Sequence, residues 1–345
     1  MSAFASRLVN VMLGRSASDA VELSAPGRTA VVVPAAGGEL SSFRVEWQGQ
    51  STETIYRALN YTDRDLPPSR WTGRAPLLWP QPGRCRMPGE KVSVTAAGEI
   101  GSWLLDGLRL DMPVHGFVRG LAWSLEAHGA DAHSAWATVA LTDNEITRSY
   151  FPFAFRLECT YRLDAHSLRL RYRVTNRESR RPFWFGIGNH ISFCLPFTTA
   201  GAYEDCFIYS PTRMQMEVGP DAFLTGSVID RDLSRGRRLA DAALRDTMYG
   251  GYRGGQAVVE LWDPASFGMR VAQRVAGGPA VPDSALRFVF WAEPESRYFC
   301  PEPWIGEPDT LNTRRAAVML AAGEAFLWEV FFDPVLSRTD LSFRP

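Results

Sequence analysis

Residues 153–175 read FAFRLECTYRLDAHSLRLRYRVT, and this stretch decides the fold class of the chain. From Phe153 to Leu163 apolar residues alternate with mostly polar neighbours, which is the period of two of a strand with one buried face. A turn follows at residues 164–167, and the alternation resumes from Leu168 to Val174 with arginines between the apolar positions. The two runs predict an antiparallel β-hairpin.

Similar short β-prone runs recur along the chain, and most are separated by clusters of Gly, Pro, Asn or Asp. They span residues 30–33, 42–47, 136–141, 258–262, 286–291 and 326–332. Long amphipathic helical patterns are hard to find. Regular short strands without intervening helices predict an all-β protein, a sandwich or barrel of antiparallel sheets.

The domain organisation is expected to be simple. No Gly/Ser linker divides the chain, so residues 1–345 are predicted to form a single domain, with residues 1–20 as an N-terminal extension. Residues 1–14 are expected to hold a short local element such as a helix. Long loops are expected at residues 60–76, 196–206 and 216–256, and long loops on a rigid β scaffold commonly carry binding sites.

Composition excludes several classes of protein. The chain is 46% hydrophobic and 22% charged with a formal net charge of -1, so a packed core is expected and nucleic acid or an anionic membrane is not an expected partner. Five cysteines form neither a CxxC pair nor a dense framework, which predicts reduced thiols in the cytoplasm. No apolar run approaches the ~20 residues of a membrane span. A monomer or homodimer is expected.

Three short segments each place one ionisable residue among apolar, Gly or Pro neighbours. They are PVHGFVR at 113–119 with His115, FGIGNH at 185–190 with His190, and CPEPW at 300–304 with Glu302. A histidine there is tunable across neutral pH, and a carboxylate between prolines beside a tryptophan is expected to be more basic through desolvation. Taken singly, each histidine is also typical of a buried group that only binds a backbone carbonyl.

In order along the chain, these segments resemble the aldose 1-epimerase (galactose mutarotase) family, with its HGxxR, Gly-x-His and Glu-Pro-Trp motifs. The last motif continues here as EPWIGEPDTLN over residues 302–312, and the resemblance extends to residues 37–40, 76–80 and 150–153. It implies a large galactose mutarotase-like β-sandwich with a sugar cleft. It also implies a reaction that interconverts the α and β anomers of a free hexose or close derivative.

Transferred motif by motif, the resemblance makes Glu302 the base and His190 the acid, with His115 assisting at the same end of the sugar. Arg84, in Pro-Gly-Arg at 82–84, matches the family arginine that contacts sugar hydroxyls. Asp246 is matched to the family aspartate. A base that removes the C1-hydroxyl proton and an acid that protonates the ring oxygen are sufficient, so no metal or other cofactor is expected.

Two tryptophans adjoin the motif residues and are predicted to contact the substrate. The C–H face of a sugar stacks on aromatic rings, so Trp79 and Trp304 are candidate substrate-binding residues. The alternative for both is simple packing in the core.

Three other functions stay open. The arginines at 231, 235, 237 and 238 favour a hexose-6-phosphate 1-epimerase, if they hold a phosphate. Ile191 and Ser192 replace the usual Pro-Tyr pair of the family, which favours a non-catalytic carbohydrate-binding protein. A β-sandwich glycoside hydrolase or lyase would need a second carboxylate, for which Asp246 is the candidate.

Overall fold

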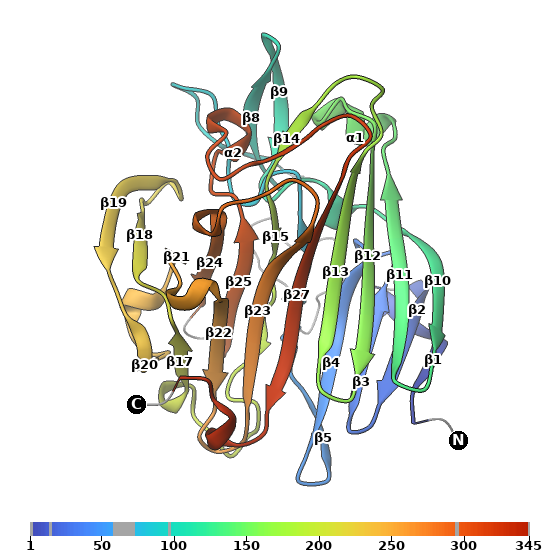
Figure 1. The fold of residues 1–345 in the computed structure, drawn as a ribbon, viewed down its shortest axis with the longest axis vertical. Coiled ribbons are helices and arrows are strands. Elements are labelled where there is room, and N and C mark those ends of the chain that lie inside the picture. Colours follow the sequence, from blue (N-terminus) through green and yellow to red (C-terminus); the bar gives the residue numbers. More distant parts are fainter. Residues whose placement is uncertain (1–2, 14–15, 58–72, 96–97, 294–296, 344–345) are drawn as a thin grey trace.

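The computed structural model describes residues 3–13, 16–57, 73–95, 98–293 and 297–343. The chain forms two packed layers of antiparallel sheet, which confirms the predicted all-β class (Figure 1). No helix in these described ranges is long and apolar enough to cross a membrane.

One layer is a continuous sheet, called here the long sheet. The predicted hairpin lies within it: Phe155 pairs with Asn176 and Leu163 with Leu168, and burial alternates along both strands. In spatial order its strands are β10 (Ser124–Ala130), β11 (Ser134–Thr142), β12 (Phe155–Asp164), β13 (Leu168–Asn176), β27 (Ala325–Val335), β23 (Gly268–Gly277), β22 (Ala257–Trp262), β17 (Phe207–Ser210) and β20 (Leu233–Arg238).

The second layer consists of two sheets. The N-terminal sheet is β1 (Ala5–Leu13), β2 (Ser16–Ala25), β3 (Arg28–Val33), β4 (Glu39–Trp47) and β5 (Gln50–Glu53), and it packs on β11 and β12. The other, called here the Glu302 sheet, packs on β22 and β23. Its order is β19 (Leu224–Asp230), β18 (Met214–Val218), β21 (Thr247–Gly250), β24 (Leu286–Trp291), β25 (Tyr298–Ile305), β15 (Ile187–Asn189) and β6 (Leu77–Leu78), with β16 (Phe193–Cys194) also paired to β25.

Smaller elements cover one end of the two layers (Figure 1). They are the sheet β7 (Ser93–Thr95), β8 (Gly98–Leu105) and β9 (Leu108–Pro113), the pair β14 (Phe183–Phe185) and β26 (Val318–Leu320), and the helices α1 (Glu145–Tyr150) and α2 (Thr310–Thr313). Single 3-10 turns occur at Val118–Gly120, Tyr203–Asp205, Ala242–Leu244, Arg253–Gly255, Asp283–Ala285 and Arg338–Asp340. Helix α1 begins where Asn144 and Thr147 form a reciprocal capping box.

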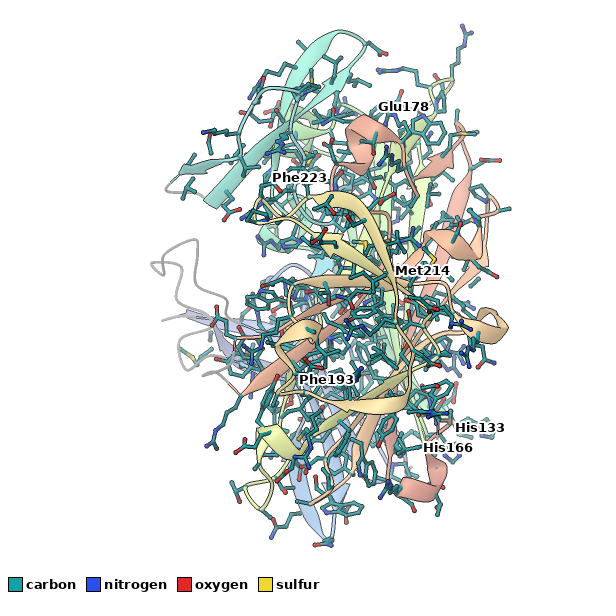
Figure 2. All side chains as sticks on the ribbon, turned by 90° about the vertical axis from the view of Figure 1, so that its left-hand side faces the viewer. His133, His166, Glu178, Phe193, Met214 and Phe223 are labelled. Carbon is teal, nitrogen blue, oxygen red and sulfur yellow. The ribbon has the colours of Figure 1, made fainter. Side chains whose placement is uncertain are left out.

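The hydrophobic core lies between the layers. Most of it is one connected cluster of buried side chains, which includes residues from Phe4 near the N-terminus to Phe332 on β27. All six β-prone runs predicted from the sequence are strands or parts of strands. Two histidines outside the candidate site, His133 and His166, are exposed in turns at the periphery of the molecule (Figure 2).

Two sequence-based expectations are wrong. The expected N-terminal helix is absent, because residues 5–13 form strand β1 and pair residue by residue with β2. Residues 216–256 are not one loop, since β19, β20 and β21 lie within them. Strand β19 is exposed along almost its whole length at a sheet edge, so its sequence lacks the alternation that reveals a half-buried strand. Of the loop expected at 60–76, residues 60–72 lie outside the described residues.

Candidate active site

Glu302 lies on β25, a strand whose residues are all buried. Successive side chains of a strand alternate between its faces, so Glu302 and Trp304 point to the same side. The indole Nε1–H of Trp304 donates to Glu302 Oε2 at 3.1 Å. Because Gly188 is the register partner of Trp304, the indole ring lies directly over a residue without a side chain. One oxygen of the Glu302 carboxylate is therefore held by a side chain of the same strand.

His190 follows β15 and holds the other carboxylate oxygen. Its Nε2 lies 3.3 Å from Glu302 Oε1, and the two side chains are 6% and 2% exposed. The backbone N–H of His190 donates to the carbonyl of Pro76, and Asn189 binds both the carbonyl of Ala75 and the hydroxyl of Tyr172. These bonds fix the imidazole relative to Glu302, which lies 112 positions further along the chain.

His115 stands beside this pair in a left-handed backbone conformation with φ 67°. Its Nδ1 accepts a hydrogen bond from the N–H of Gly83 at 3.1 Å, so the neutral ring carries its proton on Nε2. The ring centroid lies 5.3 Å from that of His190 and 6.0 Å from that of Trp304, both edge to face. The structure therefore brings together the three residues that the motifs singled out.

Burial shifts the pKa values of Glu302 and His190 in opposite directions. It raises the pKa of Glu302 well above its ordinary value, with Asp246 raising it further, while the Trp304 hydrogen bond and Arg119 oppose this shift. Burial lowers the pKa of His190 well below its ordinary value, and the electrostatic effects of its neighbours His115 and Arg119 lower it further. Glu302 thereby becomes a stronger base, and protonated His190 becomes a stronger acid.

The pKa of His115 is also lowered well below its ordinary value, first by burial and then by Arg119 and Arg84. Together with the bond from Gly83, this makes His115 a neutral ring whose Nε2–H is a hydrogen-bond donor. The sequence had left the protonation state of this residue open.

Arg84 lies beside His115 but its guanidinium is already paired. Its Nη2 is 2.7 Å from Glu99 Oε2, and its Nη1 donates to the carbonyl of Asp221 at 3.0 Å. Arg84 is therefore next to the site, with its charge compensated by Glu99. Contact with a sugar hydroxyl stays a prediction for this residue.

Asp246 precedes β21, has φ 49° and acts electrostatically on Glu302. Strand β24 connects the two, since Met248 of β21 pairs with Val289 and Val289 pairs with Glu302. Burial raises the pKa of Asp246, and Arg245 opposes this shift. The structure thus places this carboxylate on the same side of the molecule as the base.

The prediction that Trp79 contacts the substrate needs correction. Its side chain has no exposed surface and packs against the rings of Phe117, Phe151, Phe155, Phe183 and Phe185. An indole surrounded on all sides by core rings has no face to offer a sugar. Its backbone nevertheless supports the site, because Trp79 forms a β-bridge with Gly116, next to His115.

Two observations bear on the alternatives. Ile191 and Ser192 are fully buried, and the Ser192 hydroxyl contacts the Cys300 sulfur at 3.1 Å. Both residues of the unusual pair are thus part of the packed core. Of the arginine cluster, Arg237 and Arg238 on the edge strand β20 are ion-paired with aspartates 3.6 and 2.8 Å away. A phosphate there would have to compete with those carboxylates.

Sequence reasoning missed four residues near the site. Arg119 closes the HGxxR motif and Glu39 lies in the quoted 37–40 turn, so both were visible but were given no role. Arg74 forms an ion pair with the buried carboxylate of Glu39. Trp291, at the end of β24, packs edge to face on His190 with ring centroids 5.6 Å apart. Trp291 can be recognised as a neighbour of the site only from its position in the folded sheet.

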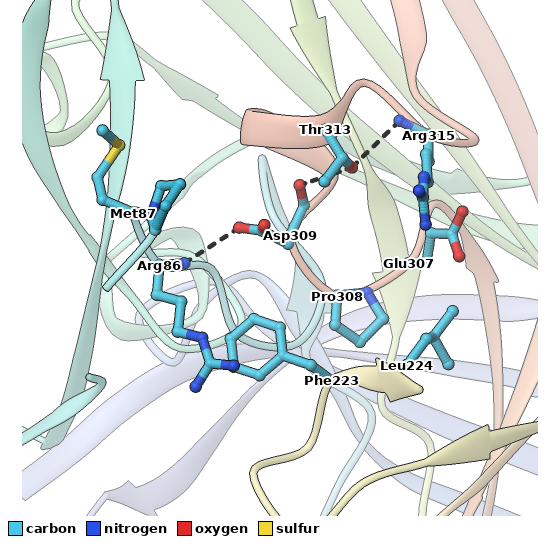
Figure 3. Close-up of a pocket in the computed structure, with 10 residues that line it drawn as sticks. Arg86, Met87, Phe223, Leu224, Glu307, Pro308, Asp309, Thr313 and Arg315 are labelled. Atoms are coloured by element: carbon cyan, nitrogen blue, oxygen red, sulfur yellow. Dashed lines mark hydrogen bonds between the residues drawn. The ribbon is translucent and has the colours of Figure 1, made fainter. Parts of the chain in front are cut away.

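Two adjoining cavities open beside the loop that carries Arg84. One, of about 260 Å³, is lined by Arg86, Phe223, Pro308 and Asp309 among others (Figure 3). The other, of about 270 Å³, is lined by Arg84, Arg86, Glu99, Asp221, Phe223 and their neighbours. Glu302 lines neither of them. Within the described ranges, no group of three or more His, Cys, Asp or Glu side chains is placed to hold a metal ion.

Several known proteins resemble this chain in sequence or in fold. The chain is 28% identical over 144 residues to protein LacX of Lactococcus lactis subsp. lactis, covering 40% of this chain and 42% of that protein. It is 35% identical over 72 residues to a provisional glucose-6-phosphate 1-epimerase of Salmonella typhimurium, covering 19% and 24%. The chain thus matches less than half the length of either relative.

A solved structure of a galactose mutarotase related enzyme from Lactobacillus acidophilus superimposes with a TM-score of 0.71 at 21% identity, covering 98% of both chains. This likeness shows a shared fold. A sequence model of the aldose 1-epimerase family matches residues 19–273, which is more than half of the chain. The chain therefore belongs to the aldose 1-epimerase family.

Proposed function

We propose that this protein interconverts the α and β anomers of a free hexose or a close derivative by general acid–base catalysis. The observation that carries the proposal is the buried pair of His190 and Glu302, whose facing atoms are 3.3 Å apart. A base and an acid this close together can act on the two oxygens that are bonded to C1 of one hemiacetal.

The proposed reaction proceeds in one ring-opening step and its reverse. Glu302 removes the proton of the C1 hydroxyl while protonated His190 donates to the ring oxygen, so the C1–O5 bond breaks and an aldehyde forms. The aldehyde rotates, and the same two groups close the ring on its other face. Positioned acids and bases of this kind contribute typically ~10²–10⁴-fold each.

The protonation states of the pair are coupled, because Nε2 of His190 and Oε1 of Glu302 lie 3.3 Å apart in a buried site. The reaction needs Glu302 ionised and His190 protonated, while burial favours the opposite distribution of the same single proton. Ionised Glu302 is therefore a strong base and protonated His190 a strong acid, but the pair rarely occupies this reactive protonation state. His115, as a neutral donor, would hold a sugar oxygen without competing for that proton.

Free hexose is preferred over hexose 6-phosphate because the two arginines that line the cavity beside the site are compensated. Arg84 pairs with Glu99 at 2.7 Å, and Arg86 pairs with Asp221 at 2.6 Å. The phosphorylated substrate is the second candidate, and the local match to a provisional glucose-6-phosphate 1-epimerase favours it. Exchange spectroscopy of glucose and of glucose 6-phosphate at equal concentration separates the two.

Mutarotation of freshly dissolved α-D-glucose and α-D-galactose, followed by polarimetry, tests the function itself. The wild-type protein should accelerate it, and Glu302→Gln should reduce kcat by ~10²–10⁴-fold because the amide cannot accept the proton. Full activity of the variant would exclude Glu302 as the base. Calorimetric sugar binding without any acceleration by the wild type would show a binding protein instead. Release of reducing ends from oligosaccharides would favour a hydrolase.

A further inference from the structure

Glu39, the first residue of β4, is a carboxylate with a fully buried side chain. Arg74 Nη1 lies 2.9 Å from its Oε1, and the charge of Arg119 also acts on it. The proton transfers proposed for Glu302 and His190 do not use these residues. A buried ionisable group is costly, so its position beside the site calls for an explanation.

The fold places Glu39 between the two arginine-bearing segments. On one side, the N–H of Gly37 donates to the carbonyl of Leu121, and a Cβ on Gly37 would lie 2.6 Å from the carbonyl oxygen of Arg119. On the other side, the N–H of Ala75 donates to the carbonyl of Leu40. The turn that carries Glu39 is thus in direct contact with both segments.

Both arginine segments continue into the candidate active site. The N–H of Ser192, two residues after His190, donates to the carbonyl of Arg74 at 2.9 Å. Arg119 acts electrostatically on Glu302 and on both histidines of the site. The positive charge felt by Glu302 therefore depends on how completely Glu39 compensates these arginines.

We propose that Glu39 is a positioning residue of this site: its carboxylate pairs with Arg74, offsets the charge of Arg119 and so limits the positive charge that reaches Glu302. The inference rests on the proposed function, because it assigns Glu39 to the tuning of the proposed base. Glu39 itself need not touch the substrate.

The charged surroundings of both carboxyls are defined. Glu39 is faced by Arg74, Arg119 and Tyr161, and Glu302 by His190, Asp246, Arg119, Cys300 and Trp304. Arg119 is in turn influenced by Arg74, Glu39, Glu302 and Glu99. Burial raises the pKa of Glu39 to about 7 against the opposing effect of the two arginines. The compensation by Glu39 therefore changes around neutral pH.

Glu39→Gln removes the negative charge and keeps the shape. The arginines are then uncompensated, the Glu302 carboxylate is stabilised, and the titration midpoint of Glu302 should fall by about one pH unit. Carbon-13 NMR of labelled glutamate carboxyls measures this midpoint, with the Glu302 signal assigned by its loss in Glu302→Gln. The alkaline limb of kcat/KM for anomer exchange, which follows the raised pKa of Glu302, should move in the same direction.

Glu329→Gln is the matched control. Glu329 is also a fully buried carboxylate held by two arginines, Arg171 and Arg274, but it lies on β27 of the long sheet. Its loss should leave the Glu302 midpoint unchanged. The double variant Glu39→Gln/Arg74→Gln removes one charge of each sign and should return the midpoint towards that of the wild type.

Arg74→Gln alone provides an independent test should Glu39→Gln fail to fold, because it should raise the midpoint. An unchanged midpoint in a folded Glu39→Gln or Arg74→Gln protein, or an equal shift in Glu329→Gln, would overturn the inference. The NMR midpoint does not depend on turnover. A shift in a protein that shows no anomer exchange would therefore refute the proposed function and leave the role of Glu39 standing.

Discussion

At the scale of single residues, burial is the main cause of the chemistry available at the site. The same removal from water raises the pKa of Glu302 and lowers the pKa of His190, because it disfavours the charged form of each. The indole of Trp304 opposes this effect on Glu302 by donating to its carboxylate. That hydrogen bond therefore favours ionisation of Glu302.

Trp304→Phe should raise the pKa of Glu302, because the carboxylate loses a donor that lowers it. Because Glu302 has the higher pKa of the pair, the alkaline limb of the kcat/KM profile should move to higher pH by about one unit. Hydrogen bonds to charged groups are among the stronger ones. The profile for galactose anomer exchange between pH 4 and 9 measures the shift.

Trp328→Phe is the control for this substitution. Trp328 is also fully buried and its Nε1 donates at 3.1 Å, but to the uncharged amide of Gln273. Its replacement should lower stability and leave the limb in place. An alkaline limb of Trp304→Phe that coincides with that of the wild type would show that the indole does not tune Glu302.

At the scale of elements, close packing between neighbouring strands fixes the site. Strands β15 and β25 bring Gly188 opposite Trp304, and the β-bridge between Trp79 and Gly116 anchors the turn that carries His115. At Gly116, with φ 74°, a Cβ would lie 1.9 Å from the carbonyl oxygen of Trp79. Glycine is required at this close approach.

Gly188→Ala should displace the indole of Trp304. The added Cβ would lie 2.6 Å from Cδ1 and 3.0 Å from Nε1 of that ring, and the ring is enclosed. Overpacking of this kind costs about 1–3 kcal/mol. We expect kcat to fall at least about tenfold, because Glu302 loses its donor and the ring beside His115 moves.

Gly120→Ala is the comparison for that variant, because a Cβ there would meet nothing within 4 Å. The free energy of unfolding of Gly120→Ala should stay within about 0.5 kcal/mol of that of the wild type, as is usual for surface substitutions that disturb no packing or hydrogen bond. Chemical denaturation and anomer-exchange rates of the two variants check the prediction. Equal behaviour of both alanines would contradict a packing role for Gly188.

At the scale of the whole molecule, two buried carboxylates make the free energy of unfolding depend on pH in opposite directions. Burial raises the pKa of Glu39 from its ordinary 4.5 to about 7. For Glu329, hydrogen bonds from Arg274 and Arg171 outweigh the effect of burial, and they lower its pKa. Ionised Glu39 therefore costs stability as the pH rises, whereas ionised Glu329 supplies stability that is lost as the pH falls.

Glu39→Gln should change the pH dependence of the free energy of unfolding between the ordinary pKa of 4.5 and the folded value of about 7. Wild type and variant should be similar near pH 4, where Glu39 is protonated. At pH 8 the variant should be more stable by up to roughly 3 kcal/mol, because it does not have to ionise a buried carboxyl.

Urea denaturation at a series of pH values measures this difference. Glu329→Gln should show the opposite sign, with lower stability than the wild type at pH 7, because it loses ion pairs to Arg171 and Arg274. A Glu39→Gln protein that is less stable than the wild type at pH 8 would contradict the prediction.

The sequence by itself determined the fold class and the residues that define the candidate site. Alternation of apolar and polar residues over 153–175 is a local property, and it survives because each strand has one face in the core. The ordered motifs singled out His115, His190 and Glu302, and the structure brings all three together. The exposed edge strand β19 was missed because it has no buried face to leave a pattern.

Only the tertiary structure decided how these residues are paired. The proton position on His115 depends on Gly83, the exclusion of Trp79 from substrate contact depends on surrounding core rings, and the charge near Glu302 depends on Glu39. Each of these contacts joins segments far apart in the chain. Their geometry follows from how the sheets pack, and packing is a property of the whole core that no local pattern encodes.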